Sequence, residues 1–130
     1  MNRLRALTLS PLLLFAMPLS LAPLAAAPPP ATVVIDLSSF AFAPSVIRLR
    51  AGEPVTLRLN NSSDSVHDFT SRLFFDSASA VRGDVRRGKV TLKGRQSATV
   101  QLTPAAGTYT LTCSRFTHKM RGMSGTIIVE

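Results

Sequence analysis

The strongest constraint on the fold is an alternation of apolar and polar residues with a period of two. It is clearest at Val55, Leu57 and Leu59, where Thr56 and Arg58 occupy the positions between them. Successive side chains of a β-strand point to opposite faces of a sheet, so this pattern indicates strands with one buried face. The β-branched run "TIIVE" ends the chain. The same alternation is found at residues 33–37, 47–50, 89–93, 97–102 and 108–112.

Turn signals separate these runs: "AGEP" at 51–54, "KGRQ" at 93–96 and "TPAAG" at 103–107. About seven short strands, each with one polar face, predict an antiparallel β-sandwich. Residues 72–84 interrupt the alternation, and "LFFDSASAV" within them is compatible with a short helix or a packed loop. An immunoglobulin-type sandwich is disfavoured, because its hallmark is a cysteine pair packed on a tryptophan, and this chain has one cysteine and no tryptophan.

The first 27 residues predict a signal peptide. Residues 1–5 are basic, residues 6–24 are rich in leucine and interrupted by prolines, and three alanines follow. A membrane anchor is the alternative, but the run is short and prolines suit a spanning helix badly. With residues 1–27 cleaved, residues 28–31 form a proline-rich linker and residues 32–130 a single small domain. This organisation predicts a periplasmic or secreted protein.

The chain contains a single cysteine, Cys113, so it cannot form an internal disulfide. In an oxidising compartment an accessible thiol is prone to oxidation. The thiol is therefore either buried among apolar residues or bound to a metal. The residues that follow Cys113 favour the metal.

The motif "CSRFTHKMRGMSG" begins at Cys113. This residue continues the inward-facing alternation of Tyr109 and Leu111, so its side chain should point into the sandwich at the end of a strand. His118 and Met123 follow at intervals of five, in a segment that must turn before the last strand. A cysteine at a strand end with two ligands from the next loop is an arrangement that suits a small metal site.

A second histidine, His67, lies in "NNSSDSVHDFT", after the strand at 55–59. His67, Cys113 and His118 would supply two imidazoles and a thiolate, and a methionine would add a thioether. This is the ligand set of a blue-copper electron-transfer centre. Thiolate and thioether favour Cu(I), whereas imidazoles suit Cu(II), so a mixed set supports both oxidation states.

The pattern C-x4-H-x4-M-x-G, followed by an apolar strand and preceded by a distant histidine, resembles the cupredoxin family. Its five-and-five spacing is similar to the rusticyanin-like branch. The stretch "FAFAPSVIRLRAGEPVTLRLNNSS" resembles the family's opening strands. The resemblance covers residues 31–130. It implies an all-β, Greek-key sandwich or barrel of about seven to eight strands, a single copper cycling between Cu(I) and Cu(II), and one-electron transfer.

The resemblance also implies roles for individual residues. His67, Cys113 and His118 would be equatorial copper ligands and Met123 the axial one, with Met120 as the alternative axial ligand. Met120 is otherwise expected, together with Phe116, in an apolar patch around His118, whose edge is the usual exit for electrons in cupredoxins.

Two positions depart from the family pattern. Asp68 follows the first histidine, where cupredoxins often have an asparagine that ties the ligand loops together. The sequence "RFT" precedes His118 in place of Pro-Gly. A negative charge at Asp68 would favour Cu(II) and lower the reduction potential.

The formal charge is +8, and loss of Arg3 and Arg5 with the signal peptide would leave about +6. This excess is compatible with a solvated basic face, and it also predicts attraction to a redox partner with an acidic docking surface or to an anionic membrane surface. Nucleic acid is disfavoured, because the protein is predicted to be exported and has few aromatic residues for stacking. We expect a monomer. The basic residues cluster at Arg82, Arg86, Arg87, Lys89, Lys93 and Arg95, and again at Arg115, Lys119 and Arg121.

Two functions are compatible with these features. The first is a periplasmic carrier of single electrons between redox partners, and the alternative is a carrier or storage protein that delivers copper. An enzyme is disfavoured, because no catalytic site is visible beyond a Cys-His pair, and two histidines are too few for a multicopper oxidase cluster.

Five phenylalanines are expected in the core: Phe40, Phe42, Phe69, Phe74 and Phe75. Tyr109 is also expected in the core, with its hydroxyl bonded to backbone at a Greek-key corner.

Overall fold

The computed structural model describes residues 26–115, 117 and 120–130. Of the features predicted above, residues 1–25 of the signal peptide lie outside the described residues, as do Phe116, His118 and Lys119. In the part of the chain that is described, no helix is long and apolar enough to cross a membrane.

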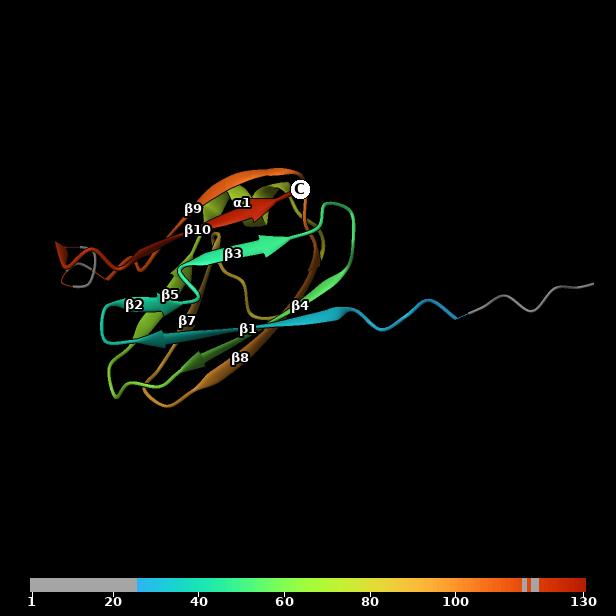
Figure 1. The fold of residues 1–130 in the computed structure, drawn as a ribbon. Helices are drawn as coiled ribbons and strands as arrows, with labels where there is room; N and C mark the ends of the chain where they lie inside the picture. Colours follow the sequence, from blue (N-terminus) through green and yellow to red (C-terminus); the bar gives the residue numbers. More distant parts are fainter. Residues whose placement is uncertain (1–25, 116, 118–119) are drawn as a thin grey trace, which may run out of the picture.

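Two five-stranded sheets face each other (Figure 1). The first sheet contains, in spatial order, β2 (Ala41–Ala43), β1 (Ala31–Ser38), β4 (Val55–Asn61), β8 (Ser97–Thr103) and β6 (Ser79–Arg82). The second contains β3 (Val46–Leu49), β10 (Ser124–Val129), β9 (Gly107–Thr112), β5 (His67–Thr70) and β7 (Lys89–Leu92). The predicted all-β sandwich is confirmed.

The core lies between the two sheets and follows the predicted alternation. Along β4, Val55, Leu57 and Leu59 are buried, while Arg58 is exposed. Burial of each such aliphatic side chain stabilises the fold by about 1.5–3 kcal/mol. Of the predicted aromatic core, Phe40 is only half-buried but packs against the cluster. The other four phenylalanines are buried: Phe42, Phe69, Phe74 and Phe75.

The expectation of a purely antiparallel arrangement is wrong for two strand pairs. β1 runs parallel to β4, with Ala31 opposite Val55. β10 runs parallel to β3, with Thr126 opposite Val46. A period of two identifies the buried face of a strand but not the direction of its neighbour. The chain crosses from the first sheet to the second between β2 and β3 and returns to the first sheet for β4.

The interruption at residues 72–84 forms a short helix, α1 (Arg72–Ser77), followed by β6. Phe74 and Phe75 of α1 are buried against the core. The predicted corner hydrogen bond is also present, because the Tyr109 hydroxyl donates to the carbonyl of Ala105 at 2.9 Å.

The two ends of the sandwich differ. The loop that joins β9 to β10 projects from one end, whereas residues 26–30 leave from the opposite end (Figure 1). This loop contains the Cys113 motif. The candidate site is therefore at the end of the sandwich remote from the start of the domain.

Candidate metal centre

Two predicted ligands, Cys113 and Met123, lie at the two ends of the loop between β9 and β10. Cys113 directly follows β9, and Met123 directly precedes β10. Thr112 and Ser124 face each other in the two strands, and the Cys113 N–H donates to the Met123 carbonyl at 3.2 Å. Both side chains are buried, with exposed fractions of 0% and 1%. The sheet therefore fixes both ends of the predicted ligand loop.

His67, the third described candidate, begins β5 and is 1% exposed. β5 pairs with β9 at Thr70 and Thr112, so His67 lies on the strand beside β9, which ends at Thr112 just before Cys113. The next residue contacts the cysteine directly, because the Asp68 N–H donates to Cys113 Sγ at 3.5 Å. The structure thus brings His67, Cys113 and Met123 to the same end of the sandwich. The fourth candidate, His118, lies outside the described residues.

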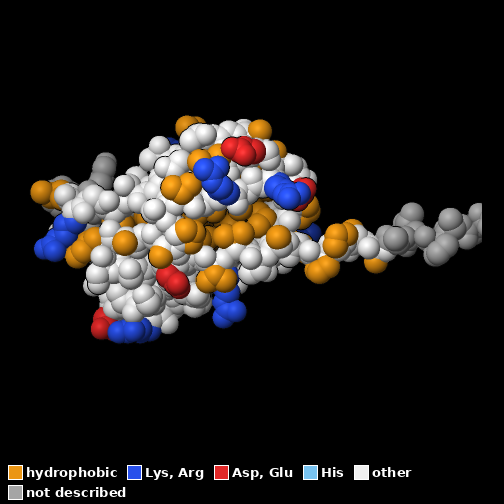
Figure 2. Space-filling view, viewed as in Figure 1, with side chains coloured by type: hydrophobic (Ala, Val, Ile, Leu, Met, Phe, Trp, Pro, Cys, Tyr) orange, Lys and Arg blue, Asp and Glu red, His pale blue; other side chains and the backbone are white. Residues whose placement is uncertain are grey.

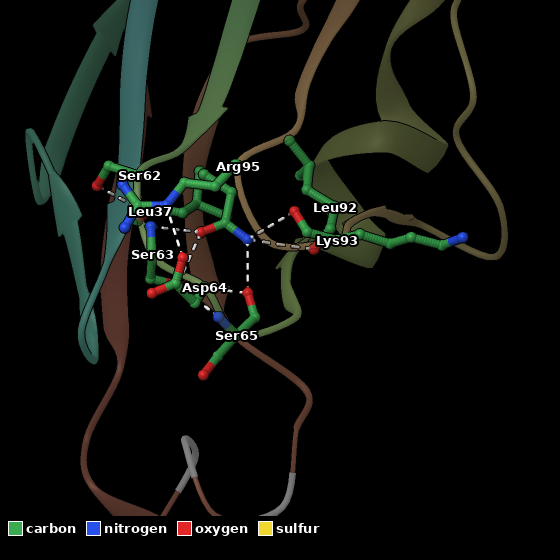
Figure 3. A network of polar contacts seen from close by, with 9 residues as sticks. Leu37, Ser62, Ser63, Asp64, Ser65, Leu92, Lys93 and Arg95 are labelled. Carbon is green, nitrogen blue, oxygen red and sulfur yellow. Dashed lines mark hydrogen bonds and ion pairs between the residues drawn. The ribbon is translucent and has the colours of Figure 1, made fainter.

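The loop that leads to His67 is fixed by a buried asparagine, Asn61, at the end of β4. Its Nδ2 donates to the carbonyls of Ser65 at 2.7 Å, Lys93 at 2.9 Å and Leu92 at 3.3 Å. Its Oδ1 accepts from the backbone N–H of Ser63 at 3.1 Å and from that residue's hydroxyl at 2.9 Å. Figure 3 shows Ser63, Ser65, Leu92 and Lys93 close together, with these hydrogen bonds drawn as dashed lines. Asn61 thereby joins the approach to β5 to the end of β7.

A second contact holds the same loop from outside. Arg95 Nε donates to Asp64 Oδ1 at 2.8 Å, and the Arg95 N–H donates to the Ser63 carbonyl at 3.0 Å (Figure 3). The hydrogen bond and the charge of Arg95 lower the pKa of Asp64, and the same pairing raises the pKa of Arg95. Gly94, which precedes Arg95, has no room for a side chain, because a Cβ there would collide with the Asp64 carbonyl.

The carboxylate of Asp68 connects β5 to the ligand loop. It is 1% exposed, and its Oδ1 accepts from the Ser114 N–H and from the Thr70 hydroxyl, each at 2.6 Å. Its Oδ2 accepts from the Ser114 hydroxyl at 2.7 Å and lies 3.8 Å from Arg115 Nε. The aspartate therefore ties the loops together, which is the role that the resemblance gives to an asparagine.

Sequence reasoning missed the other members of this network. Thr70 and Ser114 have no distinguishing pattern, and Lys89, whose Nζ donates to Ser114 Oγ at 3.4 Å, was seen only as part of a basic run. The available signal was the position of Asp68 next to a candidate ligand. A buried acid at that position requires hydrogen-bond donors, and Thr70, two positions away, is one of them.

The rim of the site combines basic and apolar groups. The Arg121 guanidinium lies 4.6 Å from the ring centroid of Phe40, and Met120 is 74% exposed. The side chain of Arg115 is 47% exposed. Figure 2 shows basic and hydrophobic side chains together at the loop end of the molecule.

The donor types at this end fit copper better than a hard cation. Imidazole, thiolate and thioether are nitrogen and sulfur donors, whereas Mg²⁺ and Ca²⁺ require oxygen ligands. Within the described ranges, no three His, Cys, Asp or Glu residues could hold a metal together. The predicted set therefore depends on the thioether of Met123 and on His118.

Comparisons with known proteins find one family model and several solved structures that resemble the chain. A family model described as a cupredoxin-like domain matches residues 11–129. Auracyanin B is 24% identical, with a TM-score of 0.58, over 81% of this chain and 93% of that one. The dithionite-reduced auracyanin of Roseiflexus castenholzii is 19% identical, with a TM-score of 0.60, over 77% and 97%. Auracyanin A of Chloroflexus aurantiacus, described as a "blue" copper protein, is 20% identical, with a TM-score of 0.57, over 78% and 100%. No curated protein sequence matches the chain.

Proposed function

Because the chain belongs to the cupredoxin-like family, we propose that it is a type 1 copper protein that carries single electrons between redox partners in the periplasm. The observation that carries this proposal is the contact between β5 and Cys113. The Asp68 N–H donates to Cys113 Sγ, and the adjacent His67 and the loop residue Met123 are buried at the same end.

Four residues would hold the metal. His67, His118 and the thiolate of Cys113 would be the equatorial ligands, and the thioether of Met123 the axial ligand. Copper, when bound, supplies the one-electron couple between Cu(I) and Cu(II). The protein would take no other part in a reaction, so we propose a carrier without enzymatic activity of its own.

The residues around the ligands have defined tasks in this proposal. The Asp68 N–H stabilises negative charge on the Cys113 sulfur, as hydrogen bonds to ligand sulfurs do in metal centres. The backbone bond from Cys113 to Met123 restrains the loop, so its ends keep their separation when the charge of the site changes. Burial of His67, Cys113 and Met123 excludes water from these donors.

The rim offers a surface for the partner. The exposed thioether of Met120 supplies apolar area, while Arg115 and Arg121 supply positive charge. Charges of one sign around a contact surface accelerate encounter with a partner of opposite sign. We therefore propose an acidic docking surface on the partner, and expect electron-exchange rates to fall as ionic strength rises.

One observation favours copper delivery as a second candidate function. Met120 is a soft donor that is 74% exposed on the ligand loop, where it could receive or release Cu(I). A delivery protein would lose copper to a Cu(I) chelator upon reduction, whereas an electron carrier would retain it through repeated redox cycles. Replacement of Met120 by leucine would slow transfer to the chelator only in the delivery protein.

The proposed function is tested by adding Cu(II) to the mature protein and recording the visible absorption spectrum. We expect an intense thiolate-to-copper band that is absent in Cys113→Ser. Arg121→Gln is the matched control, because it changes an exposed residue of the same loop that contacts Phe40 and leaves the thiol, so the band should persist. A colourless complex in the wild-type protein would contradict the proposal.

A further inference from the structure

Asp68 is the only acidic residue buried in the described part of the chain, with 1% of its surface exposed. Burial of a charged carboxylate is unfavourable unless hydrogen bonds and opposite charges compensate for lost water. The backbone N–H of this residue donates to Cys113 Sγ. The fold therefore holds a buried carboxylate, which is unfavourable for stability, beside a candidate copper ligand. Packing alone does not explain this placement.

The hydrogen bonds around Asp68 match an ionised carboxylate. An ionised carboxylate only accepts hydrogen bonds, and both of its oxygens face donors. The Ser114 N–H and the Thr70 hydroxyl point to Oδ1, and the Ser114 hydroxyl points to Oδ2. Lys89 donates to Ser114 Oγ, which leaves the hydroxyl proton directed at Asp68.

Two cations compensate the charge from the surface. Arg115 Nε lies 3.8 Å from Asp68 Oδ2, in an ion pair that is too long for a hydrogen bond. Lys89 acts through the Ser114 hydroxyl. The Arg115 side chain is 47% exposed, so solvent screens its positive charge. The Asp68 side chain is 1% exposed, so its negative charge is screened much less.

An asparagine at position 68 would reproduce much of the geometry but not the charge. Its Oδ1 could still accept from Ser114 and Thr70. Its Nδ2 would present protons toward Arg115, which is itself only a donor. The aspartate therefore adds a fixed negative charge to an otherwise similar tie between the loops.

We propose that Asp68 and Arg115 form a charge pair that sets the redox preference of the copper site, with Asp68 also positioning Ser114 and Cys113. This proposal rests on the proposed function. The buried charge of Asp68 favours Cu(II) over Cu(I), and Arg115 opposes it from the surface. Both residues are positioning residues, because they act on the metal through the ligand loop and through the local field.

The charge component is tested by measuring the reduction potential of the copper-loaded protein. Asp68→Asn should reduce the preference for Cu(II) about tenfold, which is a rise of 59 mV for a one-electron couple. Arg115→Gln should shift the preference the opposite way by about threefold, because its charge is partly screened. An unchanged potential in Asp68→Asn would overturn the proposal.

A double variant tests the pairing. Without the Asp68 charge, Arg115 loses its anchor, and solvent screens its charge. Arg115→Gln should therefore have little effect on the potential in the Asp68→Asn background. Arg121→Gln is the matched control, since Arg121 contacts Phe40 and should shift the potential equally in both backgrounds. Equal shifts by Arg115→Gln in both backgrounds would show an independent surface charge and overturn the pairing.

The positioning component is tested in the metal-free protein, so it can succeed or fail independently of copper binding. The readout is the rate at which iodoacetamide, an uncharged reagent, modifies Cys113. Asp68→Ala removes both hydrogen bonds between Asp68 and Ser114 and should accelerate modification about tenfold. Asp68→Asn keeps an acceptor for the Ser114 N–H and should remain within about threefold of the wild type. Equal rates in Asp68→Ala and the wild type would overturn the positioning role.

Discussion

The backbone nitrogen of Asp68 lies 3.5 Å from the sulfur of Cys113 and donates a hydrogen bond to it. The two residues are 45 positions apart in sequence. This contact joins the strand that begins at His67 to the strand that ends before Cys113. Two residues that the sequence identifies as candidate ligands, His67 and Cys113, therefore lie at the same end of the fold.

Asn61 should contribute strongly to stability, because its amide serves three carbonyls in a buried position. Asn61→Ala leaves these groups without their donor, and we expect the free energy of unfolding to fall by about 2–3 kcal/mol. Urea denaturation of the metal-free protein measures this change.

Asn60→Ala is the matched control for that variant. The neighbouring Asn60 makes its hydrogen bonds to Asp36 and Ser97 at the surface. Its loss should cost less than about 1 kcal/mol. Equal losses in the two variants would mean that the Asn61 network does not fix the loop before His67.

Tyr109→Phe removes the hydroxyl that donates to the Ala105 carbonyl. The hydroxyl also accepts from Ser77 Oγ at 3.0 Å, and the ring remains packed against Phe74 at a centroid distance of 5.5 Å, so only the hydrogen bonds of the hydroxyl are lost. We expect the free energy of unfolding to fall by about 1 kcal/mol. The visible spectrum of the copper-loaded variant should match the wild type, and an altered spectrum would contradict the assignment of Tyr109 to a corner remote from the metal.

The Asp64–Arg95 pair predicts an acid-dependent component of stability. Arg95 lowers the pKa of Asp64 below its ordinary value of 3.8. A group with a lowered folded-state pKa stabilises fully above its unfolded pKa, and this contribution disappears as pH falls through the folded value. Stability measured from about pH 6 downward should therefore decline less steeply below about pH 4 in Arg95→Gln than in the wild type.

The same pair offers an internal control. In Asp64→Asn the titrating carboxyl is gone, so adding Arg95→Gln should leave the acid limb of the profile unchanged. Because both side chains are exposed, raising the salt concentration should also reduce the difference between wild type and Arg95→Gln. A salt-independent difference would point to a cause other than this ion pair.

The axial ligand can be separated from its competitor by two leucine substitutions. Met123 is buried beside the Cys113 backbone, whereas Met120 is 74% exposed. Met123→Leu removes the predicted axial thioether at nearly constant volume and should change the visible spectrum and raise the reduction potential. Met120→Leu should change neither, and the reverse outcome would assign the axial role to Met120.

The sequence predicted local features of the fold well. The alternation at Val55, Leu57 and Leu59 identified the buried face of β4, and the break at residue 72 marked α1. The parallel pairing of β1 with β4 was not predictable, because side-chain periodicity contains no information about which strands become neighbours.

For the site, the sequence singled out residues with distinctive chemistry. Cys113 and His67 were identified from their type and spacing, and the structure brings them to one end. The positioning groups Asn61, Thr70 and Ser114 were missed, because common polar residues acquire a role only through their partners. Leu92 lies 31 positions from Asn61 and Asp68 lies 46 positions from Ser114, beyond any local pattern, whereas Thr70 is only two positions from Asp68 and lacks any pattern that marks it.

X-ray absorption at the copper edge of the loaded protein identifies the atoms that bind the metal. We expect two imidazole nitrogens and one thiolate sulfur as near neighbours of a single copper, with one imidazole lost in His67→Gly and the sulfur lost in Cys113→Ser. A copper surrounded only by oxygen and nitrogen, or an environment unchanged in both variants, would contradict this expectation.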